Sequence, residues 1–430
     1  MKVSRSILIV AVILAGTSGC IHKLNLSPTP AIHNPVVNVA SDPSLSFQAG
    51  FAKEVISPKV HVWMAGYDSL RRSHGVHDDL TARALVLKQG NEKLAMVSLD
   101  LIGLNRFDIE KIKAQVPGFR PDQILIACTH VHAGPDTMGV WGLPPLYSGQ
   151  NKKYTATFGP AIARAIARAE AAAVPVSAWT AVYQMDPTLM YNMNAGEPKD
   201  DTMGLMVFKD DADKVVATLV NLTGHPEVLK KNNRMISADF PGVMYREVEK
   251  KYGGGCLLFN GALGSLISPV VELKPTPDFA DVEEMGIKAA AQVDKGMARL
   301  VREERPSIVH KMSLILVPVE NKIFTILLRF RMIERDAYAG PSLLTEVNLI
   351  EIGSAQFVTF PGEAYPKQGL NIRKLQKPNS FQIGLADDEL AYILYPEDYY
   401  SERYKYEAGL CPGPQLAVEV EKALTELLKE

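Results

Sequence analysis

The chain has 430 residues, of which 47% are hydrophobic and 22% are charged, and its formal net charge is −2. This length allows a large buried core, and the balanced charge excludes the strongly basic surface on which nucleic-acid binding depends. The four cysteines show no CxxC spacing and only three remain after Cys20, so neither a disulfide framework nor a zinc–thiolate site is expected.

The first twenty residues, MKVSRSILIVAVILAGTSGC, have the order of a secretory signal. Lys2 and Arg5 precede an apolar run that is too short to span a bilayer, and small residues follow it. Residues 1–19 are therefore predicted to be a signal peptide. The ending TSGC resembles the bacterial lipobox, which implies that Cys20 is lipid-modified and anchors the chain to a membrane of the bacterial cell envelope, outside the cytoplasm. An ordinary exported protein is the alternative.

Residues 20–46 are rich in proline, serine and asparagine and show no sustained periodicity. We expect them to form a flexible tether that begins at the lipidated cysteine. Residues 47–430 have an ordinary globular composition without a linker-like interruption, so we expect them to form one large domain.

Apolar, β-branched segments and amphipathic helical segments are interspersed along this domain. The predicted strands cover residues 84–87, 94–99, 124–128, 205–208, 215–222, 256–259, 308–319, 324–330 and 349–360. The predicted helices cover residues 107–116, 156–172, 241–252, 281–301, 366–375 and 416–428. Because strands and helices alternate regularly only in the first half, we expect an α/β fold with a mixed β-sheet core flanked by helices.

Two histidines stand one residue apart in the segment CTHVHAGPD, residues 128–136. We expect the strand that begins at residue 124 to continue through His132, because Gly-Pro stops it only afterwards. In an extended chain His130 and His132 would face the same side about 6.5 Å apart, so both imidazoles could reach one site. Imidazole is both a zinc ligand and a proton carrier near neutral pH. The spacing alone is compatible with three roles for these histidines: metal ligands, a proton-transfer pair, or two structural residues.

Three further segments place chemical groups where a strand gives way to a turn. His225 follows strand 215–222 in the turn TGHP, and Glu363 follows the apolar residues 357–360 in the turn PGE. A loop near the C-terminus holds six tyrosines within residues 392–406. A turn histidine, a glutamate in the first turn of a helix and packed aromatic rings are the alternatives. Together with the histidine pair, these groups could bind or assist a hydrolytic zinc ion.

Two other segments have simpler interpretations. Asp100 ends the predicted strand 94–99 and is either a carboxylate that orients a ligand histidine or a residue at a helix N-terminus. The stretch FNGALG, residues 259–264, lacks the Lys-Ser/Thr of a phosphate loop, so no nucleotide partner is expected. Its glycines are expected to let the backbone pass close to the metal pocket.

Eight segments occur in the order that one protein family shows. They read GFAKEVISP from residue 50, MAGY at 64–67, GVHDDLTARALVL at 75–87, VSLDLIGL at 97–104, CTHVHAGPDT at 128–137, LVNLTGHPEVL at 219–229, TFPGEAY at 359–365 and YEAG at 406–409. They resemble the catalytic, N-terminal domain of the neutral, non-lysosomal ceramidases, which are zinc-dependent N-acyl amide hydrolases. The resemblance implies a zinc cofactor and, as substrate, ceramide or a related N-acyl amide.

The resemblance also implies a set of site residues. The family's zinc ligands correspond to His130, His225, Glu363 and Tyr392. His132 matches the acid/base histidine, which passes a proton to the departing amine. Tyr406 matches the tyrosine that hydrogen-bonds the developing oxyanion. This last match requires a short insertion in the preceding loop, and Tyr404 is the neighbouring alternative.

The chain departs from the family pattern in two places. Family members carry an arginine in an Asn-Arg segment ahead of the second ligand histidine, whereas here Met193, or Ala195 in a shifted alignment, stands at that position. The C-terminal β-sandwich of the long ceramidases is expected to be absent, because little sequence follows the tyrosine loop. The metal machinery is therefore expected to be retained, while the substrate can differ from ceramide.

The sequence thus favours a lipid-anchored zinc amidase of the neutral ceramidase type. Two other functions remain open: a metal-dependent amidohydrolase on a non-lipid amide, including the barrel-type amidohydrolases that also use HxH, and a non-catalytic envelope lipoprotein that binds lipid or glycan.

Overall fold

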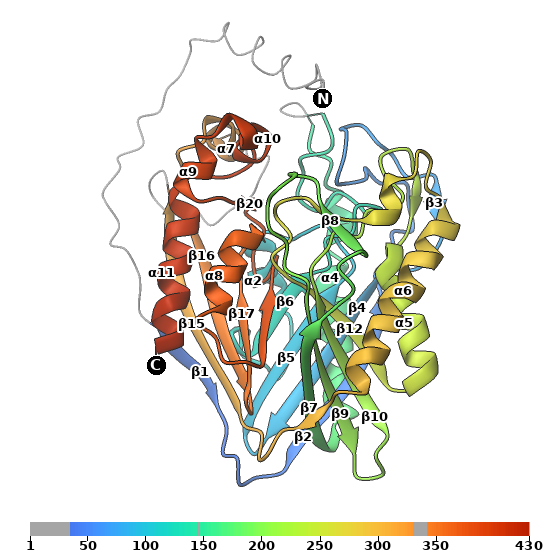
Figure 1. The fold of residues 1–430 in the computed structure, drawn as a ribbon, viewed down its shortest axis with the longest axis vertical. Helices are drawn as coiled ribbons and strands as arrows, with labels where there is room; N and C mark the ends of the chain where they lie inside the picture. The colour runs from blue at the N-terminus through green and yellow to red at the C-terminus, as the bar shows by residue number, and fades with distance from the viewer. Residues whose placement is uncertain (1–34, 144–146, 330–341, 430) are drawn as a thin grey trace, which may run out of the picture.

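The computed structural model of the chain describes residues 35–143, 147–329 and 342–429, and its strands form two large sheets that lie face to face (Figure 1). Helices cover the outer face of each sheet, which gives four layers. The predicted fold class, α/β with a mixed sheet core flanked by helices in one large domain, is confirmed. In the described part of the chain, no helix is both long and apolar enough to cross a bilayer.

The larger sheet has nine strands and the smaller one has five. In spatial order the larger sheet consists of β12 (Gly255–Asn260), β10 (Val215–Leu222), β9 (Thr202–Asp210), β7 (Val174–Gln184), β2 (Phe47–Val55), β4 (Thr81–Gln89), β5 (Glu92–Leu99) and β6 (Ile124–Cys128), with β14 (Val301–Arg302) on β7. The smaller sheet consists of β1 (Val36–Ala40), β15 (Ile308–Pro318), β16 (Ser342–Ile352), β17 (Ala355–Thr359) and β19 (Ser380–Ile383). Both sheets are mixed, since β5–β6, β10–β12 and β17–β19 are parallel pairs in otherwise antiparallel surroundings.

Side chains that alternate along each strand build the layers. In β4, Leu85 and Leu87 pack between the two sheets, whereas Ala84 and Val86 face the helices. In β17, Phe357 lies between the sheets and Val358 faces the helices on the other side of the molecule. Each fully buried Leu or Phe contributes about 1.5–3 kcal/mol, so the shared core between the sheets fixes their relative position.

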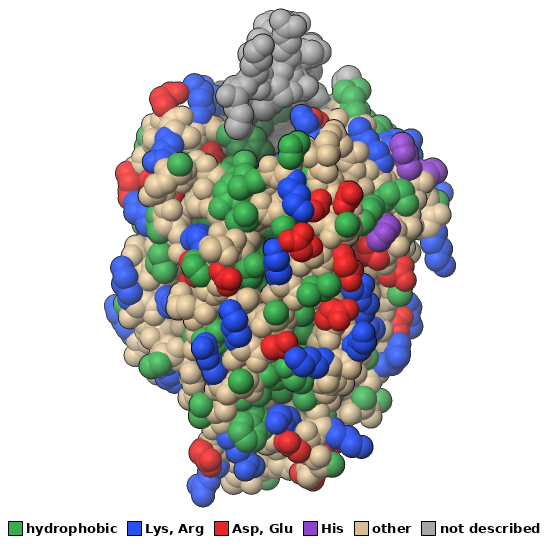
Figure 2. Space-filling model, turned by 45° about the vertical axis from the view of Figure 1, so that its right-hand side comes forward, with side chains coloured by type: hydrophobic (Ala, Val, Ile, Leu, Met, Phe, Trp, Pro, Cys, Tyr) green, Lys and Arg blue, Asp and Glu red, His purple; other side chains and the backbone are tan. Residues whose placement is uncertain are grey.

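The helices fall into two groups. The nine-stranded sheet is covered by α2 (Arg106–Lys113), α4 (Phe158–Ala171), α5 (Asp239–Tyr252) and α6 (Phe279–Met297). The five-stranded sheet is covered by α8 (Pro366–Arg373) and α11 (Gln415–Lys429). Short helices α3 (Lys152–Thr155), α7 (Lys322–Arg329), α9 (Pro396–Tyr399) and α10 (Lys405–Ala408) lie in connections. Three small strand pairs complete the fold. Two are parallel: β3 (Gly75–Val76) with β11 (Met235–Ile236), and β18 (Glu363–Ala364) with β20 (Tyr392–Ile393). The third, β8 (Met190–Asn192) with β13 (Ile267–Pro269), is antiparallel. On the face shown in Figure 2, basic and acidic side chains are interspersed without an extended basic area.

Two predicted strands are wrong. The apolar run 324–330 belongs to helix α7 as far as Arg329, and Phe330 lies outside the described residues. Asn321 explains the helix, because its side chain accepts a hydrogen bond from the backbone N–H of Ile323 as an N-cap does. The run 349–360 is not one strand, because a turn at Gly353, with φ of 61°, divides it between β16 and β17.

The predicted tether is also shorter than expected. Val36–Ala40 lie within residues 20–46 but form β1, which pairs antiparallel with β15, and Val39 is buried. The folded part therefore begins before Phe47. The predicted signal peptide, Cys20 and the first part of the tether lie outside the described residues.

A sharp bend in the nine-stranded sheet brings distant strand ends together. β2 and β7 pair over only two residue positions, and beyond this joint β12 folds back against β4 and β5. The guanidinium of Arg83 donates to Cys256 O (2.8 Å), and the Ser98 hydroxyl donates to Leu258 O (2.6 Å). The loops after β6, β10 and β12 consequently meet at one end of the molecule.

Candidate metal centre

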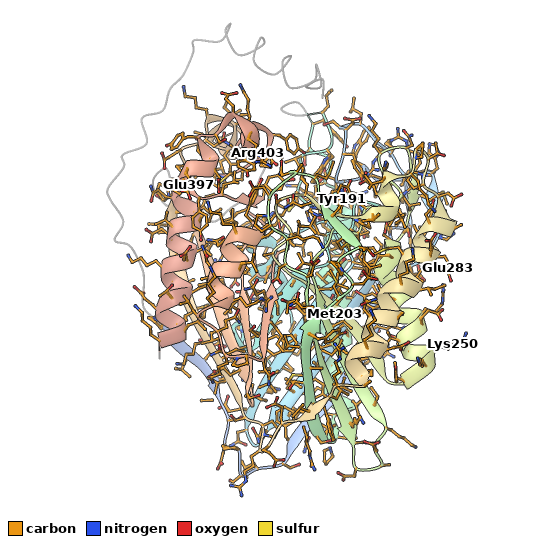
Figure 3. All side chains as sticks on the ribbon, viewed as in Figure 1. Tyr191, Met203, Lys250, Glu283, Glu397 and Arg403 are labelled. Carbon is orange, nitrogen blue, oxygen red and sulfur yellow. The ribbon has the colours of Figure 1, made fainter. Side chains whose placement is uncertain are left out.

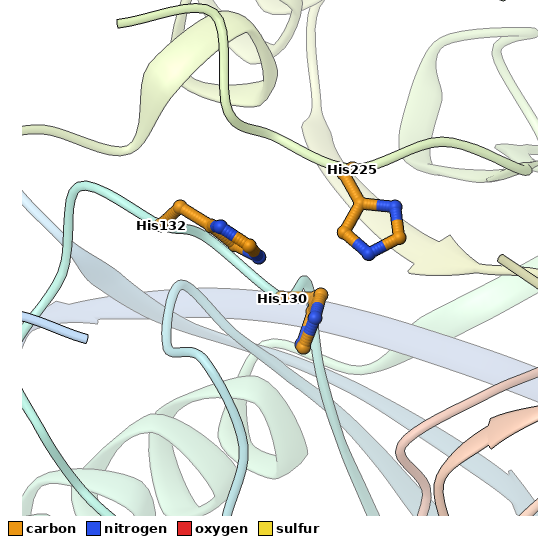
Figure 4. A group of neighbouring side chains, drawn as sticks. All are labelled: His130, His132 and His225. Carbon is orange, nitrogen blue, oxygen red and sulfur yellow. The ribbon is translucent and has the colours of Figure 1, made fainter. Parts of the chain in front are cut away.

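Three histidines come together where the loops after β6 and β10 meet. His130, His132 and His225 each offer a ring nitrogen, and these nitrogens lie within 4.8 Å of one another. The ring centroids are 4.9 Å apart for the pairs His130–His132 and His130–His225, and 5.4 Å apart for His132–His225. Figure 4 shows the three rings around a common space. Among the described residues, this is the group of His, Cys, Asp and Glu side chains that could hold a metal ion.

The local geometry of the histidine pair differs from the prediction. β6 ends at Cys128, and His130 has a φ of 68°, so the chain turns here instead of continuing as a strand. The backbone N–H groups of His130 and Val131 both donate to Leu101 O, at 2.9 and 3.2 Å, which holds the turn. A non-glycine residue in this left-handed region is strained, and such strain is typical of functional sites. The two imidazoles share a site because of this turn, not because of an i, i+2 strand spacing.

The hydrogen bonds of His130 and His225 fix which ring nitrogen is free to bind. Nδ1 of His130 lies 2.6 Å from Ile102 O, and Nδ1 of His225 lies 2.9 Å from Ile267 O. A carbonyl oxygen only accepts, so Nδ1 carries the proton in both rings and Nε2 presents a lone pair when the ring is neutral. Burial lowers the pKa of His130 to about 4, which keeps this ring neutral at pH 7.

Both free nitrogens face the same buried carboxylate. Glu363 Oε1 lies 3.5 Å from Nε2 of His130, and Oε2 lies 3.3 Å from Nε2 of His225. Burial acts to lower the pKa of His225, but the hydrogen bond to Glu363 and the charges of Glu227 and Glu363 outweigh it and the pKa is raised. Two imidazole nitrogens and a carboxylate that converge in a buried space fit a metal ion of the kind that binds nitrogen and oxygen.

Tyr392 lies beside Glu363 because their short strands pair. Glu363 in β18 and Tyr392 in β20 are directly opposite each other in a parallel pair, so their side chains start from neighbouring backbone positions. Burial raises the pKa of Tyr392 well above its usual range, and the charge of Glu363 adds to this effect. The preceding residue, Ala391, has a φ of 58°, a second strained position next to the site. The structure therefore brings the four predicted ligands to one region.

Of the two candidate tyrosines for the oxyanion, Tyr406 lies closer to this region. Its ring centroid is 6.2 Å from that of Tyr392, and its side chain is 56% exposed, at the solvent side of the ligands. The pKa of Tyr406 is raised to about 12 by desolvation and by the carboxylates of Glu363 and Glu407, so the phenol keeps its proton. Tyr404 is instead buried, with its ring perpendicular to that of Tyr365.

The surroundings of His132 contain a carboxylate that the sequence analysis did not single out. Glu227 Oε2 lies 3.4 Å from Nδ1 of His132 and accepts a hydrogen bond from the Tyr67 hydroxyl (3.0 Å). The Ser268 hydroxyl donates to the other carboxylate oxygen. Neither ring nitrogen of His132 has an aligned hydrogen-bonding partner among the described residues. The pKa of His132 is lowered by burial and by the neighbouring His130 and His225, so the ring is neutral.

A glycine packs directly on the ring of His132. Gly66, with φ of 94°, lies so close that a Cβ placed on it would come within 2.5 Å of the imidazole. The preceding carbonyl, Ala65 O, and His132 O both accept from Arg71, the second at 2.6 Å. The segment MAGY at 64–67 is therefore one wall of the site.

Met193 occupies the position where the family resemblance leads one to expect an arginine. Its side chain is half-exposed, and its backbone N–H donates to Leu266 O (3.2 Å). The nearby cation is Arg403, which donates to Ala195 O and pairs with Glu197 at 3.2 Å. Arg403 and Tyr191 are labelled at the upper end of the molecule in Figure 3. This guanidinium thus binds the 191–197 segment itself.

Asp100 does not orient a histidine. Its carboxylate accepts from the backbone N–H of Thr81 (2.9 Å) and from that residue's hydroxyl (2.6 Å), and Tyr245 contacts it at 3.3 Å. It joins β5 to β4, which is a structural role.

No protein-family model matches the chain, and no curated protein matches it. Among solved structures, neutral ceramidase from Pseudomonas aeruginosa is similar, with a TM-score of 0.73 and 18% sequence identity over 90% of this chain and 75% of that chain. A ceramidase complexed with C2 gives a TM-score of 0.73 and 18% identity over 89% of this chain and 75% of that chain. At such low identity the likeness concerns the fold. The chain therefore has a ceramidase-like fold, as the sequence resemblance implied.

Proposed function

We propose that this protein is a zinc-dependent amidase that hydrolyses an N-acyl amide, either ceramide or a related lipoamide. One observation supports the proposal most strongly: the Nε2 atoms of His130 and His225 both face the buried carboxylate of Glu363. The ceramidase-like fold supports the reaction type. The barrel-type amidohydrolase is not supported, because the described strands form two facing sheets instead of a (β/α)8 barrel.

Zinc is the metal that this donor set suits best. His130, His225, Glu363 and Tyr392 would hold it through two nitrogens and two oxygens; histidine and carboxylate are common zinc ligands, and the phenol is an unusual one. When bound, zinc would polarise the amide carbonyl and lower the pKa of a water molecule towards neutrality.

His132 is suited to move the proton. The ring is neutral, neither of its nitrogens has an aligned hydrogen-bonding partner in the described part of the chain, and Glu227 stands beside Nδ1. We infer that it accepts a proton from the attacking water as the C–O bond forms. It then delivers that proton to the amine nitrogen as the C–N bond breaks, which yields a carboxylic acid and an amine.

Tyr406 is suited to bind the carbonyl oxygen. Its phenol keeps its proton at neutral pH and stands at the exposed side of the ligand group. A hydrogen bond from this hydroxyl would strengthen as negative charge develops on the oxygen, which lowers the barrier.

The preference among N-acyl amides is expected to depend on the residue at position 193. The position that would hold an arginine carries Met193, and the charged side chains that influence Tyr406 are carboxylates. We therefore expect Met193→Arg to change the relative rates on different N-acyl amides and to move activity towards ceramide-like substrates. Unchanged ratios would remove Met193 as a determinant of specificity.

The proposal is tested by incubating the zinc-loaded protein with a panel of N-acyl amides, including ceramides, other lipoamides and short-chain amides. Released fatty acid and amine are measured by mass spectrometry. We expect turnover of at least one lipoamide, and its loss in His132→Ala but not in His77→Ala, whose half-exposed ring stacks on Phe279 outside the site. Binding of lipid without turnover of any amide would contradict the proposal and favour a non-catalytic binding protein.

We also propose, from the sequence pattern alone, that Cys20 carries a lipid and anchors the protein in the bacterial cell envelope. Metabolic labelling with a radioactive fatty acid should mark the wild-type protein but not Cys20→Ser. Equal labelling of both would contradict the anchor.

A further inference from the structure

The side chain of Asn260 joins the two loops that carry the histidines. Asn260 is the last residue of β12 and is completely buried. Its Nδ2 donates to Thr129 O (3.0 Å) in one loop and to Gly224 O (2.7 Å) in the other. Its Oδ1 accepts from the backbone N–H of Gly224 and of Gly261, both at 3.0 Å. Both N–H groups and the oxygen of the amide are therefore used.

These contacts end one residue away from each proposed metal ligand. Thr129 precedes His130, and Gly224 precedes His225. The loops also meet through the His132 N–H, which donates to Pro226 O (3.0 Å), but this bond lies beyond both ligands in the chain. Asn260 thus sets the separation of the two backbones immediately before the ligands, and it does so in a place without competing water.

The third ligand is connected to the same residue through the backbone. Asn260 O accepts from the N–H of Gly384 (2.8 Å), and the next residue, Leu385, donates to Gly362 O (3.2 Å). Gly362 directly precedes Glu363. One residue therefore relates the loops of both sheets that supply His130, His225 and Glu363.

We propose that Asn260 is a positioning residue that sets the spacing of His130 and His225 and thereby the affinity of the site for zinc. The inference rests on the proposed metal site. It follows that aspartate, although nearly identical in shape, cannot replace Asn260. Aspartate offers only acceptors when ionised, so it would place an oxygen against Thr129 O and Gly224 O and push the loops apart.

Asn221 provides a matched control. It is also buried, on β10, and its Nδ2 donates to Phe259 O (2.8 Å) and Gln382 O (2.7 Å) while its Oδ1 accepts from Gln382 N–H (3.1 Å). The same chemistry here links β10 to β12 and β19 without touching either histidine loop. Loss of these bonds should lower stability but leave the metal site in place.

The experiment compares Asn260→Asp with Asn221→Asp in the full-length protein. Zinc affinity is measured by competition with a chromophoric chelator, and the visible spectrum of the Co²⁺-loaded protein reports ligand geometry. We expect Asn260→Asp to weaken zinc binding about 10–100-fold, the cost typical of a lost supporting group, and to alter the Co²⁺ spectrum. Asn221→Asp should keep the zinc affinity and the Co²⁺ spectrum of the wild type, although its melting temperature should fall about as much as that of Asn260→Asp.

Equal affinities and spectra for both variants and wild type would overturn the role of Asn260 while leaving the metal site intact. A wild-type protein that binds no zinc would overturn the proposed function itself, and the inference with it. If circular dichroism shows that Asn260→Asp does not fold, the same comparison is made between Asn260→Ser and Asn221→Ser, with the same two results deciding it.

Discussion

The two halves of the candidate site are built differently. His130 and His225 come from loops of the nine-stranded sheet, are buried, and are held by backbone carbonyls and by Asn260. Glu363 and Tyr392 come from the side of the five-stranded sheet and lie on the short pair β18–β20, and beyond them Tyr406 reaches solvent.

This difference indicates a division of labour. A metal ion demands donors at fixed distances, so the histidine half needs rigid support. Tyr406 and Met193 are both exposed, on the side of the site that we expect to contact the acyl amide. Residues on this side can change with the substrate without loss of the metal ligands. Changes at the four proposed ligands should therefore remove metal, whereas changes at the exposed face should alter turnover with metal retained.

The largest effect is expected from the histidine ligands themselves. His130→Ala or His225→Ala should abolish stoichiometric zinc binding and reduce amidase activity on the order of a thousandfold or more, since the metal loses one of its proposed ligands. Metal analysis and kcat/KM are the measurements. His310→Ala is the control, because His310 is a buried histidine bonded to Asp122 O and Asn348 away from the site. Stoichiometric zinc in the His225→Ala protein would contradict the assignment of His225 as a metal ligand.

Removal of the oxyanion donor should rank second. Tyr406→Phe is expected to lower kcat about 10²–10³-fold, the usual cost of one such hydrogen bond, with zinc content unchanged. Tyr404→Phe, which changes a buried ring facing Tyr365, should leave kcat within a few-fold. The reverse order of the two effects would assign the role to Tyr404.

Displacement of His132 should have the next largest effect. In Gly66→Ala the new methyl group would press on the imidazole, and a shift of about 1 Å can cost about 100-fold in rate. Zinc binding should persist because the atoms nearest to the new methyl group all belong to His132 and not to His130 or His225. Gly118→Ala is the control: its φ is 78°, but its Cβ would meet only the Lys93 amine at 3.8 Å. Equal rates for both variants would argue against a proton-transfer role for His132.

The smallest effect is expected from the carboxylate beside His132. Glu227→Gln keeps the shape of the side chain and removes the charge next to Nδ1, while its single amide oxygen can accept from only one of Tyr67 and Ser268. We expect kcat to fall about tenfold, with zinc content unchanged, as for other groups that support a functional histidine. Loss of zinc in this variant would instead indicate that Glu227 helps to bind the metal.

The sequence predicted the strands that carry the site because their buried, β-branched runs are continuous. β10 matches its predicted range, β6 covers only the apolar part 124–128 of its prediction, and His130, His132 and His225 meet beyond the ends of these strands. Strand ends that break at glycine and proline were thus a useful guide to the place of chemistry.

The reason given for the histidine pair was nevertheless wrong. The spacing predicted an extended segment, whereas His130 adopts a strained left-handed conformation fixed by Leu101 O. That conformation depends on a contact with another loop, and local sequence patterns contain no signal for it.

The supporting groups were missed for the same reason. Glu227 follows His225 by two residues, yet its meeting with His132 depends on the bend between β2 and β7. Asn260 lies in the segment FNGALG, in which only the glycines suggest a role near the site. Its hydrogen-bonding partners are 36 and 131 residues away in the sequence. Both roles depend on tertiary contacts between distant loops.

The loops after β6 and β10 and the β18–β20 pair are proposed to hold one zinc ion among them. Anomalous diffraction at the zinc edge from crystals of the zinc-loaded protein would locate it. We expect one peak at about 2.0–2.2 Å from Nε2 of His130, Nε2 of His225 and the Glu363 carboxylate, with both nitrogens of His132 beyond bonding distance. A peak bound by His132 without Glu363, or no peak at the histidines, would contradict it.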